Sequence, residues 1–190
     1  AVHQVPIPQA IILLNDRFVS PANLNYYKLW DINYNWKEEE DRKIYNNADE
    51  STYYYAYSSI SVCNLILEHG PTLTEATAQQ RDELTATAKV LRAISYFTLA
   101  NYYAANYDSK TADQLLSVPL IESADIGAPS KQVTIAELYD YMINDIKSAL
   151  PTLPNTGLTI LHPGKGAAYA LLARIYLQMD NYPDALKNSE

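Results

Sequence analysis

Apolar side chains recur at steps of three and four residues along much of the chain, the spacing that places them on one face of an α-helix. The clearest case is residues 134–150, where the apolar set is Ile135, Leu138, Tyr139, Met142, Ile143, Ile146 and Leu150. Thr134 and Glu137 have the spacing of a capping box at the start of this stretch, and Pro151 stops it. The pattern predicts an amphipathic helix that buries a single stripe.

Two other segments are apolar on nearly all sides, which is typical of helices enclosed by neighbouring helices. One is the second half, 89–103, of a long helix predicted over 72–105, and the other is the alanine-rich segment 166–179. Thr72 and Glu75 have capping-box spacing, so the long helix is expected to begin there.

Shorter helices are predicted at 6–15, at 51–69 and at 184–190. No segment keeps the alternation of apolar and polar residues that marks a strand, so none is expected. Two long connections, 16–49 and 106–133, have no clear period, and long irregular segments in compact domains are often functional. The predicted fold class is all-α, with long irregular loops.

The tetratricopeptide pattern fits the C-terminal segment, because its key residues are Tyr169, Leu172, Ala173, Tyr176 and Ala185. Ala173 and Ala185 are expected where two antiparallel helices approach most closely. Ala93 and Tyr96 repeat part of the pattern in the long helix. The chain is therefore interpreted as a tetratricopeptide-like helical repeat. Its first helix pair is 72–105 with 134–150, and its second, incomplete pair is 166–190.

Charge and composition exclude some functions. The 190 residues carry a formal net charge of −8, which repels phosphate backbones and argues against nucleic-acid binding. No apolar run is long enough to span a bilayer. The N-terminal residues show neither a basic segment nor an apolar one typical of a signal peptide. The protein is therefore cytosolic, or its targeting segment has been processed or left out.

Catalytic and metal-binding motifs were not found. His3, His69 and His162 have no carboxylate or thiol at metal-ligand spacing, and Cys63 is expected to be a buried structural thiol. The acidic run 38–41 is interpreted as a solvated surface. We therefore expect no metal, no cofactor and no enzymatic activity. Arg92 lies in an apolar helix and needs a partner, which Asp145 could supply.

Aromatic residues in the first irregular segment are the candidate ligand-binding residues: Trp30, Tyr34 and Trp36. Sugars present apolar C–H faces that stack on aromatic rings, while amides such as Asn33 and Asn35 can meet their hydroxyls. The alternative is that these rings pack the segment onto the helical core. The sequence leaves both possibilities open.

Several motifs in order resemble the SusD-type (RagB/SusD) family of outer-membrane nutrient-binding lipoproteins. They are Asn64-Leu65-Ile66-Leu67, Leu91-Arg92-Ala93, Val118-Pro119-Leu120 and Leu171-Leu172-Ala173-Arg174. The resemblance covers most of 52–190, whereas the first fifty residues match loosely. It implies an α-α superhelix and one N-terminal helical domain over 1–190, truncated at its C-terminus.

The resemblance also implies a function. Such a protein sits on the cell surface over a TonB-dependent, SusC-like transporter barrel and captures a glycan or other nutrient. The helices of this chain would supply mainly the scaffold that contacts the transporter. Membrane attachment would come only from a lipid anchor that this chain lacks, because Cys63 lies inside a predicted helix. The main alternative is a tetratricopeptide adaptor that binds proteins and not sugars, and a third is a helical enzyme acting on glycosides.

Overall fold

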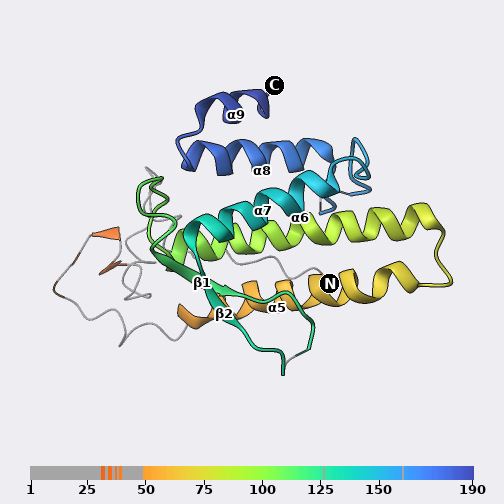
Figure 1. Ribbon diagram of the computed structural model, residues 1–190, viewed down its shortest axis with the longest axis horizontal. Helices are drawn as coiled ribbons and strands as arrows, with labels where there is room; N and C mark the ends of the chain where they lie inside the picture. Colours follow the sequence, from red (N-terminus) through yellow and green to blue (C-terminus); the bar gives the residue numbers. More distant parts are fainter. Residues whose placement is uncertain are drawn as a thin grey trace. The chain divides into compact units, whose positions relative to one another are not determined.

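The structure is a computed structural model that describes residues 31, 32, 34, 35, 37, 39, 49–125, 127–159 and 161–190 (Figure 1). Contacts along the chain divide it into two compact units, one running to Tyr55 and the other from Ala56 to Glu190. The helix predicted at 6–15 falls outside the described residues, so it stays a prediction. The single-domain prediction likewise stays a prediction.

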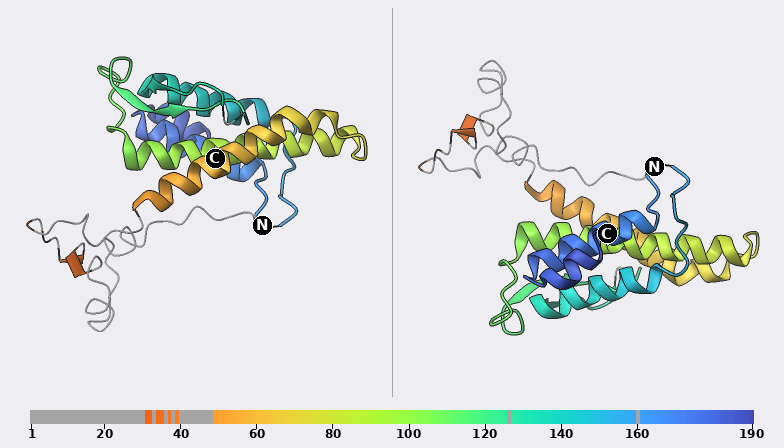
Figure 2. Two further views of the ribbon diagram at one scale, coloured as in Figure 1. Left: turned by 90° about the horizontal axis from the view of Figure 1, so that it is seen from below. Right: turned by 90° about the horizontal axis from the view of Figure 1, so that it is seen from above.

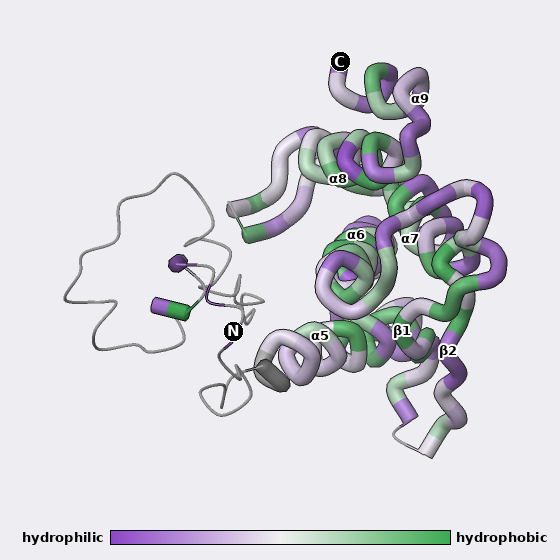
Figure 3. The backbone as a smooth tube through the Cα atoms, turned by 90° about the vertical axis from the view of Figure 1, so that its left-hand side faces the viewer, coloured by the Kyte–Doolittle hydropathy of each residue, from purple (hydrophilic) through white to green (hydrophobic). Residues whose placement is uncertain are grey.

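The helices predicted from residue 51 onward are confirmed, although the start of the long one differs. They are α5 (Asp49–His69), α6 (Ala78–Tyr103), α7 (Ile135–Ala149), α8 (Lys165–Gln178) and α9 (Tyr182–Lys187). The described residues are mainly helical, as the all-α prediction requires, and the repeat-like stacking of helices is visible end-on (Figure 3). None of the described helices is long and apolar enough to cross a membrane.

The predicted start of α6 was wrong by more than one turn. Residues Gly70–Thr72 form a short 3-10 helix, and the Thr72 hydroxyl donates to His69 O, so it caps nothing downstream. The capping box belongs to Thr77 and Gln80. The Thr77 hydroxyl accepts from the Gln80 N–H, and the Gln80 side chain accepts from the Thr77 N–H. Thr72 and Glu75 have the right spacing, but Thr72 is the last residue of the 3-10 helix and Leu73 after it is extended, so no helix starts there.

Helix α7 packs against the second half of α6, as the predicted helix pair requires, and the two helices are antiparallel. Residue numbers rise along α6 while those of their partners fall along α7. The pairs are Lys89 with Ser148, Arg92 with Asp145 and Tyr96 with Tyr141. Helix α8 instead runs parallel to α6, since Arg174 lies over Phe97 and Gln178 donates to Asn101. Seen from above, α8 and α9 lie in front of α6 and α7 (Figure 2).

A small hairpin interrupts the helices, so the expectation of no strands was wrong. Strands β1 (Leu116–Leu120) and β2 (Lys131–Thr134) pair antiparallel, and all but Thr134 lie within the predicted connection 106–133. They are too short to show alternation, and Pro119 within β1 obscures the signal further. The hairpin delivers the chain to Thr134, whose capping box with Glu137 starts α7 as predicted.

The core lies between α6 and α7. Among its fully buried side chains are Tyr96, Leu99, Leu138, Met142 and Ile146. Helix α8 adds Ala168, Leu172 and Ile175 to the same cluster. The repeat alignment placed Ala173 at a tight contact, but that residue is only half-buried, whereas Ala168 and Ala185 are buried.

Candidate functional site

Tyr34 is the one predicted ligand-binding residue that the structure describes, and it lies half-buried in a short helical turn. Asp31 organises this turn. Its carboxylate accepts from the Asn35 side-chain amide at 2.7 Å and pairs with the Lys37 ammonium at 2.8 Å. The backbone closes as well, because the Asn35 N–H donates to Asp31 O at 3.0 Å. Ile32 beside them is fully buried.

Trp30 and Trp36 lie outside the described residues, as does Asn33. Whether the three rings form one surface therefore stays a prediction. Asn35 was expected to meet sugar hydroxyls, and in the structure its amide donates to Asp31. Asp31 itself was missed in the sequence, although its spacing of four residues from Asn35 is typical of a helical side-chain pair.

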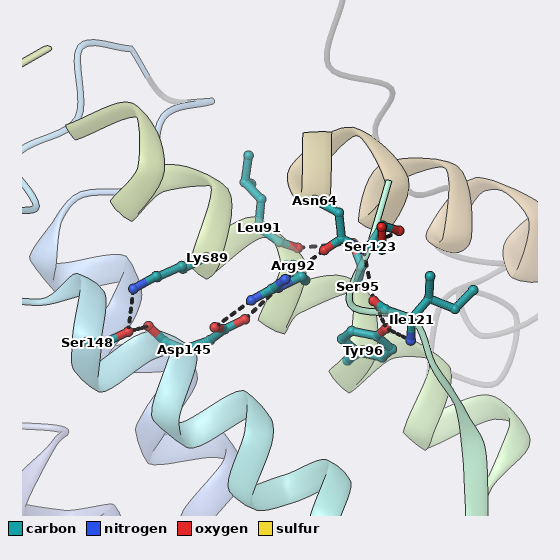
Figure 4. A network of polar contacts seen from close by, with 10 residues as sticks. All are labelled: Asn64, Lys89, Leu91, Arg92, Ser95, Tyr96, Ile121, Ser123, Asp145 and Ser148. Atoms are coloured by element: carbon teal, nitrogen blue, oxygen red, sulfur yellow. Dashed lines mark hydrogen bonds and ion pairs between the residues drawn. The ribbon is translucent and has the colours of Figure 1, made fainter. Parts of the chain in front are cut away.

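A second group of polar side chains is buried where α5, α6 and α7 meet (Figure 4). Arg92 is at its centre. Its Nε and Nη2 donate to the two carboxylate oxygens of Asp145 at 2.8 and 2.9 Å, which is a bidentate pair. The predicted partner of Arg92 is therefore confirmed. The third donor, Nη1, reaches Asn64 Oδ1 on α5 at 2.6 Å.

The environment of Arg92 keeps it charged. Burial opposes the charge, but the hydrogen bonds and the negative charge of Asp145 outweigh it, so the pKa of Arg92 rises above its ordinary value. The Tyr141 ring also lies 5.0 Å from the guanidinium carbon. Burial raises the pKa of the neighbouring Tyr96 to about 12, so its hydroxyl stays protonated and can donate.

Cys63 lies near this group and behaves as a structural thiol, as expected. Its side chain is buried, and burial raises the pKa of the thiol to about 11, although Arg92 partly opposes the shift. A protonated thiol is a poor nucleophile at neutral pH. Within the described part of the chain, no group of three or more His, Cys, Asp or Glu side chains could hold a metal ion.

The buried polar side chains around Arg92 bind one another. Arg92 donates to both Asp145 and Asn64, and Asn64 also donates to Ile121 O. These residues therefore serve the scaffold. The turn around Tyr34 is a separate feature, in which a half-buried aromatic residue lies in a backbone closed by the Asn35 N–H to Asp31 O hydrogen bond.

Comparison with known proteins assigns the chain to a protein family. A family model described as starch-binding and associating with the outer membrane, the SusD-like group, matches residues 11–177. A search of curated proteins gave no match.

Solved structures of SusD-type proteins share the fold. A SusD superfamily protein from Bacteroides fragilis is 26% identical to this chain, with a TM-score of 0.67. The match covers 75% of this chain and 34% of that protein. The surface glycan-binding protein A from Bacteroides uniformis is 20% identical with a TM-score of 0.69, covering 93% of this chain and 37% of its own. A SusD superfamily protein from Bacteroides thetaiotaomicron is 23% identical with a TM-score of 0.67, covering 73% of this chain and 30% of its own.

The chain thus spans about a third of the length of these solved structures. The family match nevertheless extends over most of the sequence, from before the aromatic segment to the end of α8. The chain belongs to the SusD-like family of starch-binding proteins that associate with the outer membrane.

Proposed function

We propose that this chain is the helical scaffold of a glycan-binding component of an outer-membrane nutrient-uptake system, and that it is not an enzyme. The observation that carries the proposal is the family match over residues 11–177, which includes both the aromatic segment and the helices α5 to α8. The family description names starch, so a polysaccharide is the ligand class that it supports.

The ligand contacts are proposed at Trp30, Tyr34 and Trp36. Aromatic rings offer flat apolar faces to the C–H faces of sugars, and the tyrosine hydroxyl adds a hydrogen-bonding group. Tyr34 lies in a turn that Asp31 holds through Asn35 and Lys37, and a fixed arrangement lowers the entropic cost of binding. These three rings supply only part of a binding surface. The 190-residue chain by itself is therefore expected to bind no glycan tightly.

The helical layer is proposed to contact a TonB-dependent, SusC-like transporter barrel, with a lipid anchor supplying membrane attachment. Support comes from the family, which associates with the outer membrane. Affinity purification of the tagged full gene product from its native membrane is expected to recover a barrel protein in stoichiometric amount. Recovery of soluble proteins only would favour the adaptor alternative.

Calorimetry with a panel of soluble polysaccharides tests the glycan site on the full gene product. Trp36→Ala and Tyr34→Ala are each expected to weaken binding at least tenfold, about 1.4 kcal/mol. Tyr169→Ala is the control, because it makes the same change at an exposed tyrosine on α8, away from the aromatic segment. Its affinity is expected to equal that of the wild type.

Two results would contradict the proposal. If the full gene product binds no polysaccharide of the panel, the glycan-binding function is wrong. If the 190-residue chain alone binds at micromolar strength and Trp36→Ala abolishes that binding, the scaffold role is wrong and the whole site lies within residues 16–49.

A further inference from the structure

An extended surface segment, residues 119–124, runs from the end of β1 and is tied to helix α5 by polar side chains. The Tyr57 hydroxyl donates to Pro119 O at 2.7 Å. The Asn64 amide donates to Ile121 O at 2.9 Å and to Ser123 O at 3.3 Å. The Glu68 carboxylate accepts from the Ser123 hydroxyl and from the Ala124 N–H. These three α5 residues are seven and four positions apart, which places them on one face of the helix.

Helix α6 adds one more tie to the same segment. The Tyr96 hydroxyl donates to Ile121 O at 3.0 Å and accepts from the Ile121 N–H at 2.8 Å. Both backbone groups of Ile121 are therefore satisfied by side chains and not by a neighbouring strand (Figure 4). The conformation of the segment thus depends on the side chains beneath it.

Asn64 can serve this segment only in one orientation. Its Nδ2 must face the carbonyl oxygens of Ile121 and Ser123, and its Oδ1 must then face into the protein. Arg92 Nη1 donates to that oxygen at 2.6 Å, so the guanidinium selects the required orientation. A flipped amide would place its NH2 group against the guanidinium and its oxygen against two carbonyls.

Arg92 is in turn held by α7, through the two hydrogen bonds to Asp145 and the Tyr141 ring. A continuous series of contacts therefore links α7, α6, α5 and the surface segment. A separate polar contact between α6 and α7, from Lys89 to Ser148 at 3.0 Å, lies one turn away from Arg92.

We propose that Arg92 is a positioning residue that couples the docking of α7 to the order of residues 119–124, acting through the side-chain amide of Asn64. When Asp145 holds Arg92, Asn64 is locked and the segment is tied down. When that pair is absent, Asn64 loses its orientation and the segment opens while the helices remain packed. The coupling fixes the positions of two exposed residues, Glu122 within the segment and Asp125 directly after it. It does not depend on the proposed glycan site.

Hydrogen exchange of the whole chain, followed by NMR at the amides of Ile121 and Ala124, tests the coupling. The double variant Arg92→Met/Asp145→Leu removes both buried charges together, which preserves packing better than removing one. Both amides are expected to exchange at least tenfold faster than in the wild type, while the amides in the middle of α6 keep their rates. Lys89→Met, the control at the neighbouring α6–α7 contact, is expected to leave both amides unchanged.

A second variant shows whether Arg92 acts through Asn64. Asn64→Leu alone should accelerate exchange at Ile121 and Ala124 by a similar factor. Adding Asn64→Leu to the double variant should then give no further acceleration, because both changes remove the same link. If the double variant fails to fold, Arg92→Lys, which keeps a charge beside Asp145, replaces it in the same comparison.

Three outcomes would overturn the proposal. One is unchanged exchange at Ile121 and Ala124 in the Arg92 variants. Another is an equal acceleration throughout α6 and α7, which would mean that Arg92 only contributes to global stability. The third is a multiplied effect when the Asn64 and Arg92 changes are combined, which would mean that they act independently.

Discussion

Arg92 and Asp145 join the middle of α6 to the end of α7 through a bidentate ion pair whose two side chains are each only 9% exposed. A pair buried to this extent has lost most of its hydration, and its attraction must offset that loss. Nη1, the guanidinium nitrogen that does not contact Asp145, donates to Asn64, so each of the three nitrogens has a partner. Removing one member is consequently very different from removing both.

Arg92→Met is expected to lower the free energy of unfolding by about 3–5 kcal/mol, because Asp145 would be left buried without its partner. Arg92→Met/Asp145→Leu is expected to recover most of this loss, since an apolar pair of similar volume carries no desolvation penalty. Urea denaturation of the wild type and both variants measures the difference. A single variant as stable as the wild type would mean that the pair is not buried in solution.

Ile143→Asp is expected to destabilise the protein severely, by about 3 kcal/mol or more, because it places an unpaired charge in the α6–α7 contact. Ile143 is 7% exposed. Asn144→Asp adds the same charge at the next residue, which is exposed, so it controls for charge alone and should change stability by less than about 0.5 kcal/mol. Thermal melting followed by circular dichroism gives both values. Equal melting temperatures for the two variants would show that α7 does not dock through this face.

The sequence was sufficient for α7 and its partner because the information there is local. A narrow apolar stripe, a capping box at Thr134 and a proline at 151 define the helix within one stretch of chain. Arg92 in an apolar helix required a partner, and Asp145 was the acidic residue on the buried side of the neighbouring helix. Local pattern and a single charge requirement together predicted the central contact of the fold.

Other features depend on contacts between distant residues, and the sequence could not supply them. The Asn64 side chain donates to Ile121 O, although the two residues are 57 positions apart in the sequence. No rule of residue spacing predicts that contact. Tyr57 of α5 donates to Pro119 O in β1 across 62 positions, a contact that the strand's own sequence does not reveal. Thr72 and Thr77 both have the spacing of a cap, and the sequence does not show that Thr72 ends a 3-10 helix while Thr77 starts α6. The candidate site at Trp30, Tyr34 and Trp36 was chosen from residue type, which gives no information on geometry.

Ala168→Leu is expected to cost about 1–3 kcal/mol, because the larger side chain would overpack the contact of α8 with the core. Ala168 is fully buried. Ala170→Leu, two residues later on the same helix, adds the same atoms to an exposed position and should change stability by less than about 0.5 kcal/mol. Chemical denaturation of the pair checks the orientation of α8. A larger loss for Ala170→Leu would mean that the helix presents its other face to the core.

Acid is expected to release the surface segment from α5, because the Glu68 carboxylate holds it. Glu68 Oε1 accepts from the Ala124 N–H at 2.9 Å and from the Ser123 hydroxyl at 3.0 Å, and these hydrogen bonds lower the pKa of Glu68 below the ordinary 4.5. When the folded pKa lies below the unfolded one, the unfolded chain binds more protons near that pH. The contribution of Glu68 is therefore complete above about pH 4.5 and is lost as the pH falls through the lowered value.

Glu68→Gln separates this contribution from the other carboxylates, among them Glu137, whose pKa is also lowered by hydrogen bonds from Thr134. Urea midpoints at neutral pH and at several values below about 4.5 should fall less steeply for Glu68→Gln than for the wild type. Ser123→Ala keeps the carboxylate but removes one of its two donors, so its midpoints should lie between the two curves. If Glu68→Gln reproduces the wild-type acid dependence in full, the carboxylate does not tie residues 123 and 124 to α5 in solution, and the acid sensitivity of the fold arises elsewhere.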